Sequence, residues 1–105
     1  MKEIDVQTLH GWRERGQRHV LLDVREPDEV AIAAIPGSLN IPMGDVQAHM
    51  AELPRDEEIV VMCHHGGRSA RVATFLAQVG FENVVNLEGG IDAWAVHVDR
   101  AMMRY

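Results

Sequence analysis

The sequence has 105 residues, of which 47% are hydrophobic and 25% charged, a mixture that fits one compact domain with a buried core. Its formal net charge is −6, with acids and bases interspersed, which argues against nucleic acid or an anionic membrane as a general partner. No apolar run approaches membrane-spanning length and the segment 1–5 has no hydrophobic signal core, so we expect a cytoplasmic protein.

The N-terminal segment predicts a helix followed by a strand. Asp5 can cap a helix that has one apolar face and stops near Gly16. The short apolar run 20–22 suits a buried strand, which ends at Asp23. The apolar face of the helix consists of Val6, Leu9 and Trp12.

The segment from residue 26 to Pro54 begins with acidic residues. Residues 26–29 contain a proline and three acids, which suits the positive end of a helix dipole. Residues 38–41 follow a Pro-Gly pair and predict a short extended segment. A third helix, closed by Pro54, is predicted from an apolar face made of Val46, Met50 and Leu53.

The second half of the sequence alternates strand and helix patterns more clearly. Residues 59–62 are the clearest buried strand, and beyond the next loop apolar residues recur with helical spacing until Gly80. Residues 84–86 predict a last strand, and a Gly-Gly turn leads into a final helix; residues 100–105 have no readable periodicity. The apolar positions of the two helices are Val72, Phe75, Leu76 and Val79, and then Ile91, Trp94, Ala95 and Val98.

This alternation predicts an α/β domain with a mostly parallel sheet covered by helices on both faces. In such folds ligands bind at the carboxyl ends of the strands, which here are the segments just after Asp23 and just after Met62. We expect a single domain over residues 1–105, with its core at about 4–98 and a C-terminal tail at 99–105.

Cys63 is the only cysteine, so it forms no internal disulfide and a reducing compartment suits the protein. A lone cysteine is by default a small buried hydrophobe. This one, however, opens a loop between the strongest strand and the best helix. Such a turn can direct backbone N–H groups inward as a nest for an anion, helped by the helix dipole and by the backbone freedom of Gly66 and Gly67. We therefore expect Cys63 to be a reactive thiol that ionises readily.

Three neighbouring side chains have possible roles at this loop. Arg68 adds a fixed charge and a planar fork suited to an oxyanion such as a sulfonate or phosphate. His64 and His65 are either exposed loop residues or rim residues that attract an anionic substrate when protonated. A metal site is not expected, because structural zinc sites usually combine two separated ligand pairs and no second pair exists.

The loop from Cys63 to Ser69, Cys-x-x-Gly-x-Arg-Ser after a Val-rich strand, resembles the active loop of single-domain rhodaneses, the thiosulfate sulfurtransferases. Two departures from the family pattern are Ala33-Ala34, where many members carry Gly-His, and the two histidines, where a lysine or small polar residue is common. Three further segments resemble family motifs in the same order along nearly the whole chain: Leu22–Glu26 with Asp-Val-Arg, Ile35–Pro42 with Pro-Gly and Asn, and Leu87–Trp94 with Gly-Gly and Trp.

The resemblance implies a five-stranded parallel sheet flanked by helices, with Cys63 as the sulfur-accepting nucleophile. It also implies that the loop amides cradle a persulfide and the departing anion. In the family a pair such as Asp23 and Arg25 is chiefly structural, which agrees with a helix cap and salt bridge, and we prefer that interpretation to substrate contact. The expected substrate-binding residues are His64, His65, Gly66, Gly67, Arg68 and Ser69.

The resulting hypothesis is transfer of sulfane sulfur from thiosulfate, or a related persulfide donor, to cyanide, a small thiol or a protein thiol, with no cofactor. A sulfur-carrier module that serves one protein partner would need the same persulfide. A cysteine phosphatase is a further alternative, since such enzymes also pair Cys with Arg on a strand–loop–helix turn. However, four residues separate Cys63 from Arg68, whereas those phosphatases have five. The sequence does not identify the physiological donor, the acceptor or the oligomeric state.

Overall fold

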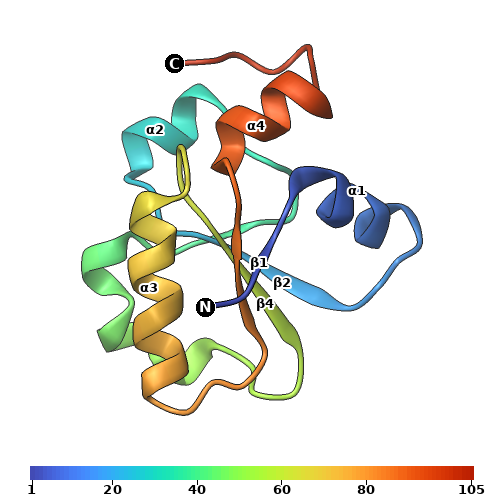
Figure 1. Cartoon of the computed structure of the whole chain (residues 1–105). Coiled ribbons are helices and arrows are strands. Elements are labelled where there is room, and N and C mark those ends of the chain that lie inside the picture. Colours follow the sequence, from blue (N-terminus) through green and yellow to red (C-terminus); the bar gives the residue numbers. More distant parts are fainter.

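The computed structural model describes all of residues 1–105, which fold as strands alternating with helices around one sheet (Figure 1). Five strands pair in the order β1-β5-β4-β2-β3, and every pair is parallel. The predicted α/β class and parallel sheet are therefore confirmed. The strands are β1 (Glu3–Ile4), β2 (His19–Asp23), β3 (Leu39–Asn40), β4 (Glu58–Met62) and β5 (Val84–Leu87).

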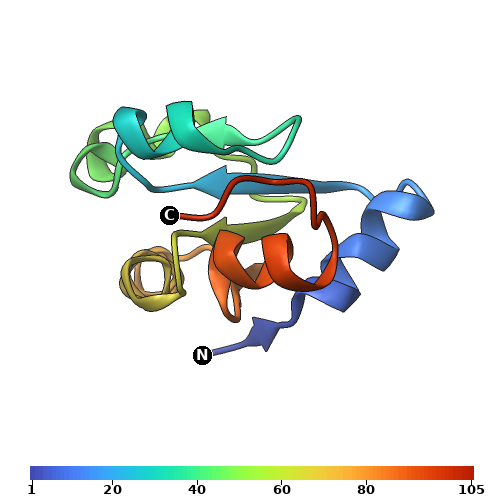
Figure 2. The same ribbon diagram turned by 90° about the horizontal axis from the view of Figure 1, so that it is seen from above.

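Helices cover both faces of the sheet, as the view from above shows (Figure 2). The α-helices are α1 (Val6–Glu14), α2 (Pro27–Ile32), α3 (Gly67–Gln78) and α4 (Gly90–His97), and two 3₁₀ segments are η1 (Met43–Asp45) and η2 (Gln47–Glu52). Side chains of α1 and α4 pack on one face, and those of α3 and the 3₁₀ segments on the other. None of the helices is long and apolar enough to cross a membrane.

The alternation of side chains along β4 divides the core into two clusters. Ile59, Val61 and the following Cys63 belong to the cluster beneath α3, whereas Val60 and Met62 belong to the cluster beneath α1 and α4. The Cys63 side chain therefore lies on the face of the sheet that α3 covers. This register places Cys63 at the N-terminus of α3.

Two helix starts form as the sequence predicts. The Oδ1 of Asp5 accepts a hydrogen bond of 2.8 Å from the Thr8 amide and caps α1. At α2 a capping box joins Glu26 and Glu29, with Pro27 at the first helical position. The side chain of Glu29 is therefore fixed by its own helix as well as by the contacts described below.

The structure differs from the sequence-based expectations at three places. Strand β1 was not predicted, because its two residues are too few to show alternation. The third helix is not an α-helix: two 3₁₀ segments, 43–45 and 47–52, form instead, and Val46 between them still packs inward. Val79 was placed on the buried face of its helix but is the C-cap residue and is 40% exposed.

The segment 99–105 runs back over α4 toward α2 at the top of the molecule (Figure 1). Met102 packs against the cluster beneath α1 and α4, whereas Met103 is exposed. Arg104 makes two hydrogen bonds to the carboxylate of Asp92 in α4, of 2.9 and 3.1 Å. These contacts bring Tyr105 to the carboxyl end of the sheet.

Candidate active site

Cys63 is the first residue after β4 and is 1% exposed. The chain then turns through residues 64–66 into α3. Gly66 has a φ of +114°, a left-handed conformation that other residues rarely adopt. This turn points backbone amides back at the sulfur, so the nest that the sequence predicts is present.

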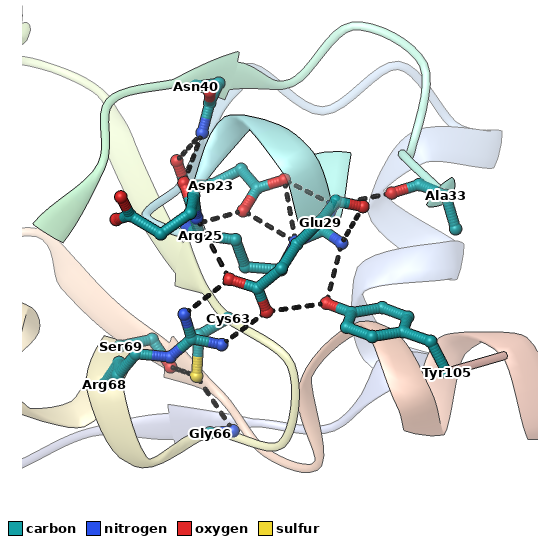
Figure 3. Close-up of polar contacts among 11 residues, drawn as sticks. Asp23, Arg25, Glu29, Ala33, Asn40, Cys63, Gly66, Arg68, Ser69 and Tyr105 are labelled. Carbon is teal, nitrogen blue, oxygen red and sulfur yellow. Dashed lines mark hydrogen bonds and ion pairs between the residues drawn. The ribbon is translucent and has the colours of Figure 1, made fainter. Parts of the chain in front are cut away.

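Two hydrogen bonds reach the sulfur (Figure 3). The Gly66 amide donates over 3.1 Å and the buried Ser69 hydroxyl over 3.3 Å to the Sγ of Cys63. Burial raises the pKa of the Cys63 thiol, but the hydrogen bonds from Ser69 and the Gly66 amide, with the nearby His65 amide, outweigh burial, so the pKa lies below its ordinary value. The thiolate is therefore stabilised by donors, without an adjacent side-chain base.

Hydrogen bonds from β5 and from the start of α4 fix the backbone of this loop. The Asn86 side chain donates to the Gly66 carbonyl over 3.2 Å, and the Ile91 amide donates to the Cys63 carbonyl over 2.9 Å. Gly90 has a φ of +59°, and a Cβ there would lie 2.4 Å from the Cys63 carbonyl oxygen. Close approach of the Cys63 backbone thus explains the second glycine of the Gly-Gly motif, since only glycine fits there.

Arg68 does not present a free fork. Its two terminal nitrogens donate to the two carboxylate oxygens of Glu29, over 2.7 and 2.8 Å (Figure 3). The pairing raises the pKa of Arg68, and the hydrogen bonds from Arg68 lower the pKa of Glu29 to about 2. Glu29 was seen in the sequence only as an acid at a helix start; the fork expected to face an oxyanion holds this carboxylate instead.

Asp23 and Arg25 form a fully buried ion pair, with the Arg25 Nη2 2.7 Å from the Asp23 Oδ2. Arg25 also donates to the carbonyl of Glu29 within α2 and to that of Ala33, the C-cap residue of α2. The expected salt bridge is present, but the N-cap of α2 is Glu26 rather than Asp23. These contacts fix α2 against the sheet, and neither residue bonds the sulfur.

A tyrosine that no sequence pattern indicates, Tyr105, completes the surroundings of the site. The Tyr105 hydroxyl donates to Glu29 over 3.0 Å and accepts from Arg25 over 2.9 Å. Its ring stacks on His64 with centroids 3.8 Å apart, and His64 in turn lies 3.9 Å from the His65 ring. Residues 100–105 lack periodicity, so no local pattern could have revealed this contact.

The two histidines differ in environment. His64 is half-buried, and burial, followed by the nearby charge of His65, lowers its pKa. His65 is exposed and lies 4.0 Å from the Asp92 carboxylate. His64 is therefore held closer to its neutral form, which makes it a poorer attractant for anions than expected.

The thiol has little open space around it. Three surface hollows are present, and Cys63 lines none of them. The hollow between η1 and α3 has a volume of about 200 Å³ and is lined partly by Met43, Val72 and Phe75. The chemistry that the site can support is consequently attack by a donor-stabilised thiolate on a small or projecting electrophile.

Comparisons with known proteins agree with this geometry. The model of the family described as "Rhodanese-like domain" matches residues 5–97. The chain is 38% identical to a sulfurtransferase of Allochromatium vinosum, over 92% of this chain and 91% of that protein. A rhodanese-related protein from Thermoplasma volcanium has a TM-score of 0.85 at 36% identity, covering 93% of this chain and 94% of that one. A rhodanese-like domain protein from Staphylococcus aureus has a TM-score of 0.87 at 30% identity, covering 100% and 99%.

Proposed function

The chain belongs to the rhodanese-like family, whose relatives include sulfurtransferases, and we propose that it transfers sulfane sulfur through a persulfide on Cys63. The observation that carries this proposal is the donor-stabilised sulfur: Gly66 and Ser69 both donate to the Cys63 Sγ at the N-terminus of α3. A thiolate is the species that such donors favour, and it is the nucleophile the reaction needs.

In the first half-reaction the Cys63 thiolate attacks the outer, sulfane sulfur of thiosulfate. A new S–S bond forms, the S–S bond of thiosulfate breaks, and sulfite leaves with its electron pair. The outer sulfur of the persulfide replaces the thiolate as the anion among the loop amides, so the same donors serve both states. No proton transfer is needed in this step, which fits a thiol without a neighbouring base.

In the second half-reaction an acceptor attacks the outer sulfur of the persulfide. Cyanide would leave as thiocyanate, and a thiolate would leave as a persulfide; either restores the Cys63 thiolate. Ser69 and the Gly66 amide stabilise the leaving thiolate. Arg68, whose charge lies near the thiolate, adds electrostatic support in both halves.

A sulfur-carrier role uses the same persulfide and is favoured by one observation, the nearly complete burial of Cys63. Burial limits access by free small molecules and suits a partner whose own group projects into the site. Steady-state kinetics separates the two roles. We expect Cys63-dependent turnover with thiosulfate and at least one of cyanide, a small thiol or a protein thiol, and loss of thiosulfate use in Arg68→Ala. Persulfide formation without multiple turnover with any small acceptor would favour the carrier.

A further inference from the structure

An anion already occupies the charged fork beside Cys63. Both carboxylate oxygens of Glu29 accept from Arg68, at 2.7 and 2.8 Å, in the paired geometry that a guanidinium offers to any planar oxyanion. The side chains are 34% and 18% exposed, so this pair is less screened than one in open solvent. A diffusing oxyanion that seeks Arg68 must therefore displace Glu29.

Glu29 is held in position by groups other than Arg68. Its Oε2 accepts from the Glu26 amide over 3.1 Å in the capping box, and its Oε1 accepts from the Tyr105 hydroxyl over 3.0 Å. Figure 3 shows the carboxylate lying between the guanidinium and the tyrosine. Because these contacts fix the carboxylate in advance, little conformational entropy is lost when it pairs with Arg68.

Tyr105 is itself fixed from two sides. Its hydroxyl accepts from the buried Arg25 over 2.9 Å, and its ring lies parallel to His64 at 3.8 Å, within the active loop. The preceding Arg104 is bound to Asp92. Residues 99–105 thus form a strap that ends on the hydroxyl contact with Glu29.

We infer that Glu29 determines the donor selectivity of the site: its carboxylate, held by Tyr105, competes for Arg68 with small anionic sulfur donors. This inference rests on the proposed function and specifies its substrate class. Thiosulfate is a dianion. It must either displace the Glu29 carboxylate from Arg68 or bind beside that carboxylate and be repelled by it. A persulfide carried by a larger thiol compound is a sulfur donor that does not need to bind the guanidinium of Arg68. Such donors do not compete with Glu29 and are the preferred class.

The size of the effect follows from the fraction of molecules in which Arg68 is free. An apparent dissociation constant equals the intrinsic one divided by the competent fraction. If Glu29 leaves the fork free in roughly a tenth of molecules, anion recognition is weakened about tenfold. Removing the charge of Glu29 should therefore recover most of the lost affinity for anions.

A pair of alkylating reagents tests the inference without relying on sulfur transfer. Iodoacetate is an anion and iodoacetamide is neutral, and with both the Cys63 thiolate forms an S–C bond while iodide leaves with the C–I electron pair. The ratio of their rate constants measures anion attraction to the site. Changes in the thiol pKa affect both reactions alike and cancel in this ratio.

The decisive variant is Glu29→Gln, because glutamine keeps the shape of the side chain and can retain the capping box. We expect the iodoacetate-to-iodoacetamide ratio to rise roughly three- to tenfold at low ionic strength. Tyr105→Phe keeps the ring on His64 but removes the hydroxyl, and should raise the ratio by a smaller factor. Glu82→Gln removes the same charge from an exposed residue after α3 and should leave the ratio unchanged.

An unchanged ratio in Glu29→Gln, or a rise equal to that in Glu82→Gln, would overturn the inference. If Glu29→Gln does not fold, Tyr105→Phe replaces it in the test, and a ratio no higher than that of Glu82→Gln would again overturn the inference. Persulfide formation from thiosulfate, followed by mass in the same proteins, separates the two proposals. A raised ratio with no persulfide in any variant would refute the proposed function only, whereas persulfide in the wild type with an unchanged ratio would refute this inference only.

Discussion

The hydroxyl of Ser69 lies 3.3 Å from the sulfur of Cys63, and both groups are buried. Ser69 belongs to the first turn of α3, so the helix supplies a side-chain donor as well as its positive end. The Gly66 amide donates a second hydrogen bond to the same sulfur, at 3.1 Å. Together these donors replace the general base that many cysteine enzymes use to generate a thiolate.

Replacing Ser69 with alanine should raise the pKa of Cys63, since the variant loses a hydrogen bond that stabilises the thiolate. The measurement is the pH dependence of iodoacetamide alkylation, whose midpoint in the wild type should lie below that of a free cysteine thiol. Thr74→Ala is the matched control, because Thr74 is exposed on the same helix and bonds a carbonyl of that helix. Equal midpoints in the wild type and Ser69→Ala would exclude this role for Ser69.

The Glu29–Arg68 pair predicts a specific acid sensitivity. The pKa of Glu29 falls from 4.5 to about 2 on folding, so the pair contributes stability that is fully present above the unfolded pKa and is lost as the pH falls through the folded one. The difference in unfolding free energy between the wild type and Glu29→Gln should therefore narrow between pH 4.5 and about 2.

Urea unfolding at several pH values would measure this difference. Glu82→Gln is again the control, because Glu82 is exposed and forms no ion pair in the structure, and its difference from the wild type should stay flat over the same range. A flat difference for Glu29→Gln as well would contradict the stabilising role of the pair.

Gly90→Ala should destabilise the protein by about 2 kcal/mol or more, because overpacking and a left-handed backbone both oppose a Cβ at this position. The added atom would meet the Cys63 and His64 carbonyls at 2.4 and 2.5 Å. Gly44→Ala is the matched control, since a Cβ there has no neighbour within 4 Å. Thermal and urea unfolding of both variants would check the prediction. Equal stabilities would show that the loop accommodates the added Cβ without loss of stability, contrary to the prediction.

The loop length predicts that the protein does not hydrolyse phosphate esters. With four residues between Cys63 and Arg68, the ring of amides is narrower than in the phosphatases, and a phosphoryl group needs a donor for each equatorial oxygen. Turnover of p-nitrophenyl phosphate should match that of Cys63→Ser. Inserting a glycine between Gly66 and Gly67 should impair sulfur transfer, because a shift of about an angstrom can cost roughly a hundredfold in rate. Robust Cys63-dependent phosphatase activity in the wild type would refute this assignment.

The sequence predicted the α/β class, four of the strands and the position of the nucleophile loop, because these features produce local patterns. Alternation of strand and helix, the run 59–62 and the motif from Cys63 to Ser69 are all visible within a few residues. Family membership is confirmed by the match over residues 5–97. The domain limits and the roles assigned to individual site residues remain predictions.

Other features depend on contacts between distant residues and leave no local signal. Strand β1 pairs with β5 across most of the chain, at Glu3 with Asn86. Tyr105 reaches Glu29 over a separation of 76 residues, and Arg68 reaches it over 39. Only the folded arrangement shows that the fork of Arg68 is already filled.

The most direct test of the account is the mass of the intact protein after incubation with thiosulfate. Sulfur transfer through Cys63 predicts one added sulfur atom on the wild type, removed by cyanide with formation of thiocyanate, and no addition on Cys63→Ser. Because Cys63 is the only cysteine, the adduct can be assigned without digestion. An unmodified wild-type mass with thiosulfate and with a persulfide donor, or an equal adduct on Cys63→Ser, would contradict sulfur transfer through this thiol.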